Sequence, residues 1–427
     1  QSEETVNQLV GEARFHRGCA YSKLVSKFGD VPLVKEELDI DQGLAMGRTD
    51  KNTVLKFIYD DFDAAAAVLP ATYPGMQRAT KGAALSFKAR IALYMADWAT
   101  AAEAAKAVMD LNIYKLHTDY SDLFLVGTKK SDELIFVIPR SVEYADYYLD
   151  DGTVRNDLIR NAGGWAATDP SWDLLAAYTC DDGLPIDESP RFDSHDPFKN
   201  RDPRCCMTIV PFGENFLGYE YSPHPEAVTV MNYATGKEVT NNDSRVNAQY
   251  ASFNGLVWKK GIDKTWTENG FRVAQDMIVC RYAEVLLIYA EAKIELNQIE
   301  QSVLDAMNSV RARAYGVDPS AADRYPAFKM TDQAKLRYEL RVERRMEFAK
   351  EHMRYMDMMR WKQAEIVMKR KGYGIIYPAS LCVEKVTSVG DWFWPFAPEI
   401  DENGLPDFTK LEQTGKIAVL TQRLWDN

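Results

Sequence analysis

The sequence predicts a mostly α-helical protein, built from repeated helical pairs, that carries one large loop-rich insertion. Apolar residues recur at helical spacing over much of residues 3–111 and 277–368. Between residues 140 and 276 this periodicity fades, and Gly, Pro, Asn and Asp punctuate a stretch that is still rich in aromatic residues. We therefore expect an N-terminal helical part at 1–139, the insertion at 140–276, and a C-terminal helical part with a tail at 277–427.

Residues 3–28 are typical of an amphipathic helix with a defined end. Phe15, Cys19 and Phe28 fall on one face at helical spacing. Gly29 can adopt the left-handed conformation that follows many helices, so we expect the helix to stop there. Cys19 is then a small core residue within this helix.

Two pairs of helices share one plan of helix, short polar turn and helix. Asp97 lies in the turn of the first pair, which is rich in alanine. Aligning Ala290 with Ala89 also aligns Ala306 with Ala105, so small residues recur where two helices would touch. The plan resembles a tetratricopeptide-like repeat. Helices are expected at 51–69, 81–94, 99–111, 277–296 and 301–314.

Residues 133–139 predict a short buried strand, and residues 331–368 predict one long helix. The run from Glu343 to Trp361 reads E-R-R-M-E-F-A-K-E-H-M-R-Y-M-D-M-M-R-W. So dense a mixture of Arg, Glu, Asp and Trp indicates a partly buried lattice of ion pairs, which is weakened strongly when one partner is removed. A catalytic role for Glu351 or Asp357 is the sharper alternative, but acids six apart on one helix do not form the facing pair that glycoside hydrolysis needs.

Composition excludes several classes of protein. The 427 residues are 46% hydrophobic and 27% charged, as in soluble globular proteins, and the net charge is −12. This balance argues against nucleic-acid binding, which needs a basic surface, and slightly disfavours a highly anionic glycan. The sequence contains no run of about 18 apolar residues, which is the length needed to span a membrane. The Cys, His and Asp spacings match neither zinc sites nor the twelve-residue calcium loop, so we predict no metal and no cofactor.

The insertion offers candidates for sugar binding. Sugars stack their C–H faces on exposed aromatic rings, while polar groups at the rim bind their hydroxyls. Trp residues in polar or glycine-flanked loops, and Tyr residues clustered near Asp, Gly or Pro, meet this need, although each could equally anchor its loop onto the scaffold. The candidate ligand-binding residues are Trp165, Trp266, Tyr147, Tyr148, Tyr219 and Tyr221. Trp172 and Trp258, by contrast, fall within apolar alternation and are expected in the core.

Several stretches together resemble one family. G-E-A-R-F at residues 11–15, F-G-D-V-P-L-V at 28–34 and R-Y-A-E-V-L-L at 281–287 are similar to the SusD/RagB-like nutrient-uptake lipoproteins of Bacteroidetes, as is the run from Glu343. In that run the family has glycine where this chain has His352 and an aromatic residue where it has Lys350. F-W-P-F at residues 393–396 resembles a late family segment, whereas the tail from residue 411 departs from the pattern.

The resemblance implies a function without catalysis. It implies a cell-surface glycan-binding protein of the outer membrane that captures an oligosaccharide and delivers it to a SusC-like TonB-dependent transporter. It also implies a lipid anchor in the full-length form, ahead of the segment that begins at Gln1, so we expect this chain to be truncated relative to the family. Two alternatives remain from the residues: an all-helical glycoside hydrolase, and a helical-repeat scaffold that binds proteins. A family member that captures peptides is a third.

Overall fold

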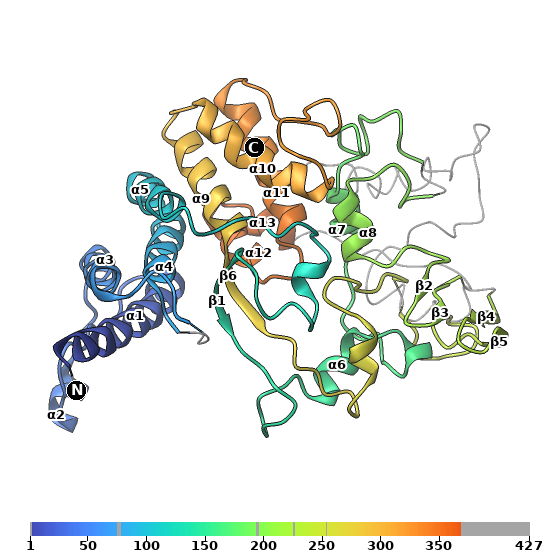
Figure 1. Cartoon of the computed structure of the whole chain (residues 1–427), viewed down its shortest axis with the longest axis horizontal. Helices are drawn as coiled ribbons and strands as arrows, with labels where there is room; N and C mark the ends of the chain where they lie inside the picture. Colours follow the sequence, from blue (N-terminus) through green and yellow to red (C-terminus); the bar gives the residue numbers. More distant parts are fainter. Residues whose placement is uncertain (1, 75–77, 194–195, 225–226, 253, 369–427) are drawn as a thin grey trace.

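The computed structural model describes residues 2–74, 78–193, 196–224, 227–252 and 254–368. These residues form a mostly helical molecule, as predicted, in which a helical scaffold lies beside a region of loops and short strands (Figure 1). The motif at residues 393–396, Cys382 and the tail from residue 411 lie outside the described residues.

The N-terminal part is a layer of helices, close to the predicted ranges. Side chains of Ser2, Asp50, Thr80 and Asp97 accept hydrogen bonds from backbone N–H groups in the first turns of four of them. α1 packs against α3, and α4 packs against α5 and α3. The helices are α1 (Glu3–Phe28), α2 (Ile40–Ala45), α3 (Lys51–Val68), α4 (Lys81–Tyr94) and α5 (Trp98–Met109).

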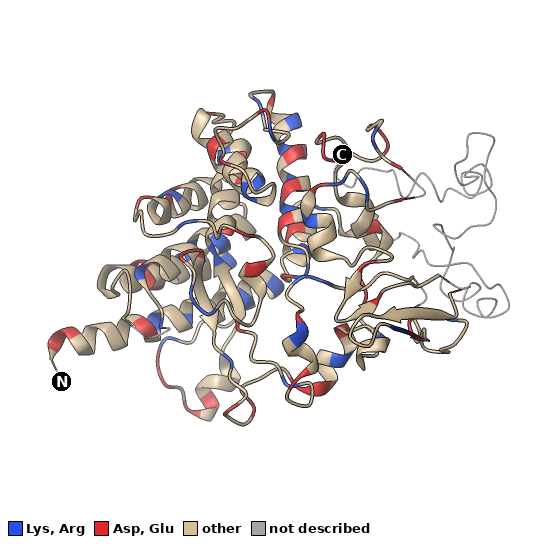
Figure 2. Ribbon diagram, turned by 45° about the vertical axis from the view of Figure 1, so that its right-hand side comes forward, with Lys and Arg blue, Asp and Glu red and all other residues tan. Residues whose placement is uncertain are grey.

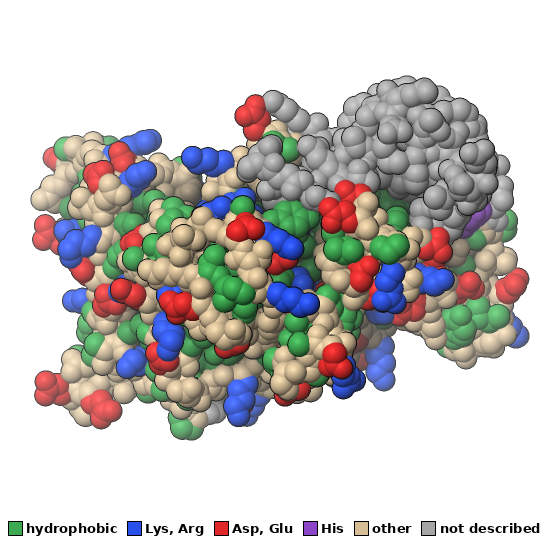
Figure 3. All heavy atoms as spheres, turned by 90° about the horizontal axis from the view of Figure 1, so that it is seen from above, with side chains coloured by type: hydrophobic (Ala, Val, Ile, Leu, Met, Phe, Trp, Pro, Cys, Tyr) green, Lys and Arg blue, Asp and Glu red, His purple; other side chains and the backbone are tan. Residues whose placement is uncertain are grey.

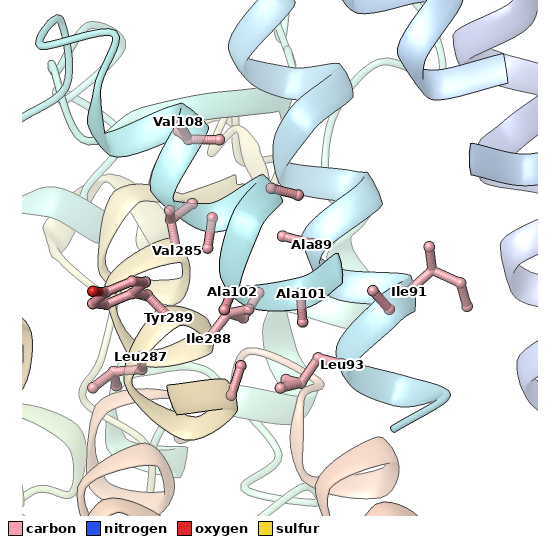
Figure 4. Close-up of a cluster of buried hydrophobic side chains, with 14 of the residues drawn as sticks. Ala89, Ile91, Leu93, Ala101, Ala102, Val108, Val285, Leu287, Ile288 and Tyr289 are labelled. Carbon is pink, nitrogen blue, oxygen red and sulfur yellow. The ribbon is translucent and has the colours of Figure 1, made fainter. Parts of the chain in front are cut away.

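The C-terminal part continues the same core. α9 (Tyr282–Glu295) lies against α5 and α10 (Gln301–Ala314), and almost all of its side chains are buried. Figure 4 shows alanines of α4 and α5 facing Val285 and Ile288 of α9. Small side chains let the helices approach closely, as the recurring alanines predict.

A strand replaces the start of one predicted helix. β1 (Leu134–Ile138) confirms the predicted strand and pairs antiparallel with β6 (Met277–Arg281). We had expected residues 277–281 to be helical, which is wrong. The β-branched Ile278 and Val279 favour an extended backbone, and pairing with β1 satisfies their segment's backbone groups before α9 begins.

The predicted long helix at 331–368 is wrong as one element, because it breaks twice. Its pieces are α11 (Gln333–Glu347), α12 (Arg354–Arg360) and α13 (Ala364–Met368). At the first break Lys350 and His352 adopt positive φ angles of 65° and 63°, the region that glycine favours. His352 stands where the similar family has glycine, so the backbone shape of the motif is kept without the glycine.

The first break has a tertiary cause. The side-chain Nζ of Lys260 lies 3.2 Å from the carbonyl oxygen of Glu347 and 2.9 Å from that of Ala349, and it also donates to Glu351. A continuing α-helix would use these carbonyls for its own ladder of hydrogen bonds. The buried lysine from the insertion therefore takes the place of the next helical turn.

The insertion is ordered around its own apolar clusters. Its strands form a small antiparallel sheet in the order β2-β3-β4-β5, separate from the β1-β6 ribbon. One apolar cluster, which includes Trp266, Tyr221 and Val154, lies among its loops. Trp172, as expected, is core in another cluster, whereas Trp258 is only partly buried. The elements are α6 (Asp151–Asp157), η2 (Arg160–Ala162), α7 (Trp172–Ala177), α8 (Pro203–Thr208), β2 (Asn215–Phe216), β3 (Tyr219–Glu220), β4 (Thr229–Asn232), β5 (Lys237–Thr240) and η3 (Lys264–Thr267).

Candidate functional site

A glycine turn presents the ring of Trp165 to solvent. Gly163 has a φ of 90°, which side chains rarely tolerate, and it ends η2. A Cβ atom on Gly164 would lie 2.1 Å from the carbonyl oxygen of Leu158, so only glycine fits. The backbone N–H of Trp165 donates to the carbonyl of Arg155 over 2.6 Å, and the residue stays 44% exposed. The loop is therefore fixed while the ring is free.

A second exposed ring, that of Tyr250, lies beside this loop. One guanidinium nitrogen of Arg160 donates to the carbonyl oxygens of both Trp165, over 3.1 Å, and Tyr250, over 3.4 Å. Tyr250 is 73% exposed. Sequence reasoning missed it, although it follows the polar run N-A-Q and has the same signal, a ring without an apolar neighbour pattern, that was used for Trp266.

Buried carboxyl groups support the two loops from beneath. Asp243 accepts hydrogen bonds from the backbone N–H groups of Arg160, over 2.7 Å, and Asn161, over 3.1 Å. Burial raises the pKa of Asp243 to about 6 and that of Asp169 to about 7, against a usual value near 3.8. Burial thus favours the neutral form of both carboxyl groups more than a surface position would.

Tyr147 and Tyr148 lie on a separate loop of the insertion. Tyr147 is 64% exposed, and its backbone N–H donates a hydrogen bond to the carbonyl of Tyr144. Tyr148 is partly buried, with the guanidinium of Arg272 5.4 Å from its ring centre. Backbone hydrogen bonds between Leu149 and Val273 hold the two segments side by side.

Three of the predicted residues are not free rings. Trp266 is 3% exposed and Tyr221 is 1% exposed, so neither can offer a face to a sugar, which corrects the expectation from the sequence. Both rings fill the apolar cluster of the insertion, and the Tyr221 hydroxyl donates to the carbonyl of Gly255 over 2.8 Å. Tyr219 is partly buried in β3 against the same cluster. In this cluster the rings pack against aliphatic side chains such as Leu158, Ile262 and Val273.

The ion-pair lattice predicted from the run at Glu343 is present and buried. Glu347 accepts hydrogen bonds from Arg281 over 2.7 Å, from Arg204 over 2.9 Å and from Arg313. Burial alone would raise the pKa of Glu347, but the three guanidiniums hold it far below its usual value. We call this set the Glu347 lattice; its members are Glu133, Asp202, Arg204, Lys260, Arg281, Arg311, Arg313, Glu343, Glu347 and Glu351.

The lattice joins segments that are far apart in the chain. Its members come from the loop before β1, from the insertion, and from β6, α10 and α11. Figure 2 shows basic and acidic segments meeting at the centre of the molecule. A neighbouring network joins Glu291 and Asp357 to Arg344 and Arg360, with distances of 2.7 Å from Arg360 to Glu291 and 2.9 Å from Arg344 to Asp357.

The catalytic alternative loses its support in this geometry. Glu351 is held between Arg281 and Lys260, and Asp357 between Arg344 and Arg360. Although burial opposes ionisation, these cations hold the pKa of both carboxyls below the usual value. A general acid needs the opposite shift. Both residues therefore act as ion-pair partners within the scaffold.

One contact connects the scaffold motif with the Trp165 loop. Lys350, which replaces an aromatic residue of the similar family, places its Nζ 2.7 Å from Asp157 at the end of α6. Asp157 in turn accepts a hydrogen bond from the hydroxyl of Thr168. Lys350 also lies 5.5 Å from the ring centre of Trp266. The motif and the candidate site are thus joined through a partly buried ion pair.

The described residues offer neither a metal site nor a membrane span. Within the described ranges, His, Cys, Asp and Glu form no group suited to hold a metal ion. None of the helices described here combines the length and apolarity needed to cross a lipid bilayer.

Comparisons with known proteins agree with the motifs. The model of the SusD family matches residues 133–376, and a model described as starch-binding associating with outer membrane matches residues 1–93. SusD-like protein P25 of Formosa agariphila is 25% identical over 378 residues, which cover 84% of this chain and 65% of that protein. The chain thus spans just under two thirds of this relative's length.

Solved structures share the fold along nearly the whole chain. A SusD-like carbohydrate-binding protein of Bacteroides fragilis is 30% identical, with a TM-score of 0.76 over 98% of this chain and 80% of that chain. A second SusD-like protein of the same organism is 25% identical, with a TM-score of 0.69 over 85% of this chain and 70% of that chain. With one family model covering more than half of its residues, this chain belongs to the SusD family.

Proposed function

We propose that this protein binds oligosaccharides through Trp165 and Tyr250 at the surface of the outer membrane. The observation that carries the proposal is the arrangement of these two exposed rings, whose loops are joined by Arg160. Flat rings beside hydrogen-bonding side chains are what a sugar needs. Two similarities support a sugar ligand and a location at the outer membrane. A 30% identical solved structure is that of a carbohydrate-binding protein, and the family model that matches residues 1–93 describes starch binding in association with the outer membrane.

The finer part of the proposal concerns delivery. In the full-length, lipid-anchored form the protein passes its glycan to a SusC-like TonB-dependent transporter, without making or breaking bonds in the sugar. Membership of the SusD family supports this partner. The carboxylates of the Glu347 lattice stay ionised and are paired with cations, which supports the lack of catalysis. Tyr147 remains a further candidate for ligand contact because its ring is exposed.

Calorimetric titration with a panel of oligosaccharides tests the binding site. Trp165→Ala should weaken binding at least about 10-fold, because stacking on the ring is lost. Tyr355→Ala is the matched control, since Tyr355 is 53% exposed on α12 and belongs to the scaffold. Equal binding by both variants would refute the assignment of the site. Release of shorter sugars from any bound polysaccharide would instead favour the hydrolase.

A further inference from the structure

Arginine side chains accompany the exposed rings of the insertion. Arg160 joins the loops of Trp165 and Tyr250, and one guanidinium nitrogen of Arg155 donates to the carbonyl of Gly163 over 2.5 Å. We call this set the arginine–aromatic surface; its members are Tyr148, Arg155, Arg160, Trp165, Tyr250 and Arg272.

Side-chain stacking connects one end of this surface to the other. The guanidinium of Arg155 lies 3.6 Å from the ring centre of Phe271, and the next residue, Arg272, lies against Tyr148. A Cβ atom on Gly163 would lie 2.9 Å from the Phe271 ring, so the ring and the Trp165 turn are in contact. The arginines therefore lie between aromatic rings on neighbouring loops.

Neither Arg160 nor Arg272 has a direct ion pair among the described residues, although the buried carboxylate of Asp243 is near enough to Arg160 to be stabilised by its charge. Among the described residues, no carboxylate oxygen lies within 4.0 Å of the Arg160 or Arg272 guanidinium, and the partner of Arg155, Asp151, is 3.7 Å away and 64% exposed. The acidic residues beneath the surface are engaged elsewhere: Asp157 pairs with Lys350, and Asp243 accepts backbone N–H groups.

This local charge contrasts with the rest of the molecule. The chain carries a net charge of −12. The face in Figure 3 intersperses basic and acidic side chains instead of gathering one sign. An anionic ligand is therefore repelled by the protein as a whole and can bind only where cations lack partners.

From this arrangement we infer that the glycan bound by the arginine–aromatic surface is acidic, with carboxylate or sulfate groups on its sugars. The inference rests on the proposed function and names the chemical class of its cargo. Rings of Trp165 and Tyr250 stack on sugar faces, while Arg155, Arg160 and Arg272 donate charged hydrogen bonds to the anionic groups. The overall acidity of the sequence pointed weakly the other way, because composition averages over the whole surface.

Matched pairs of glycans that differ only in charge test the inference. The probes are polygalacturonate, alginate and hyaluronan oligosaccharides with their methyl esters, and a sulfated galactan with its desulfated form. At least one acidic member should bind about 10-fold or more tightly than its neutral partner, since charged hydrogen bonds are lost on esterification or desulfation. Its affinity should fall as NaCl is added. The uronate and sulfate pairs separate the two sources of charge.

Single substitutions locate the effect on the surface. Arg272→Gln should weaken binding of the acidic member several-fold and leave its neutral partner unchanged. Arg324→Gln is the control, because it removes the same charge from an exposed position in the scaffold and should change neither. Near-UV circular dichroism checks that the loops remain folded.

The outcomes separate this inference from the proposed function. Equal binding of acidic and neutral partners, lost in Trp165→Ala, would overturn the inference and leave the glycan site in place. Preference for acidic glycans that persists in Arg272→Gln, Arg155→Gln and Arg160→Lys would also overturn it. Failure of every glycan in both series to bind would overturn the inference and the proposed site together.

Discussion

Arginine occupies two contrasting settings in this protein. In the Glu347 lattice, Arg204 and Arg281 are fully buried, and each contacts several carboxylates. In the insertion, Arg160 and Arg155 are partly exposed and bind backbone carbonyls beside aromatic rings. Burial beside carboxylates commits a guanidinium to stability, because an unpaired charge there is costly. Exposure beside rings leaves hydrogen-bond donors for a ligand.

The largest expected effect lies in the lattice. Glu347→Gln removes the shared partner of three buried arginines and should lower the free energy of unfolding by about 3–5 kcal/mol, measured by urea denaturation. Glu300→Gln provides the control, because Glu300 pairs with Lys293 at the surface and is 59% exposed, so its loss should cost no more than about 1 kcal/mol. Similar losses in the two variants would contradict the contrast between buried and exposed pairs.

Two tryptophans of the insertion test the same contrast between buried and exposed side chains, here without a change of charge. Trp266→Ala should lower the free energy of unfolding by about 3–5 kcal/mol, since a buried ring is replaced by a cavity. Trp165→Ala should change it by no more than about 0.5 kcal/mol, because the ring is solvent-exposed. Thermal or urea unfolding of both variants measures the difference. If Trp266→Ala is as stable as the wild type, the Trp266 ring is not part of the core and is again a candidate for ligand contact.

The link between the two regions should have a smaller energy. A double-mutant cycle of Lys350→Met and Asp157→Asn should give a coupling energy of about 0.5–3 kcal/mol for the partly buried pair, measured by urea denaturation. Additive losses in the cycle would show that the scaffold and the loop are independent.

The last effect concerns Lys260 and is spread over a range of pH. Burial lowers the pKa of Lys260 to about 8 from 10.5, although Glu351 favours the charged form. The unfolded chain therefore binds more protons between these pH values, so the contribution of Lys260 to stability increases with pH from about 8 to 10.5. The stability of the wild type relative to Lys260→Met should rise by at most about 1.4 kcal/mol per pH unit in this window. A constant difference would mean that Lys260 titrates normally.

Local patterns predicted the scaffold well because they act within a few residues. Thr80 and Asp97 cap α4 and α5 through hydrogen bonds to residues three positions away, and the alanines of α4 and α5 mark a helix contact. The break after Glu347 was not predictable, since Phe348 to Met353 contain no Gly or Pro and the cause is a lysine 87 residues away. The residues that form the lattice were recognised in part, but their partners Arg204 and Glu133 carry no local signal.

Ring exposure in the insertion was the least predictable property. Trp165, Trp266 and Tyr250 all lie in polar loops, yet Trp266 is buried and the other two are exposed. Which ring is covered depends on loops that meet only in the folded chain. The turn at Gly163-Gly164 correctly marked the exposed ring of Trp165, and the cluster of Tyr and Asp residues correctly marked that of Tyr147.

The sequence positions in the Glu347 lattice impose an order on folding. Arg204, Arg281 and Arg313 all precede Glu347 in the chain, so a growing or emerging polypeptide exposes these charges before their shared partner exists. Until α11 follows, burying the three arginines with only Asp202 and Glu133 would leave their charges incompletely paired, which disfavours the final docking of the insertion. Native packing between the insertion and the scaffold must therefore wait for the last described helices, which leaves a long interval in which a chaperone or protease can act on the chain.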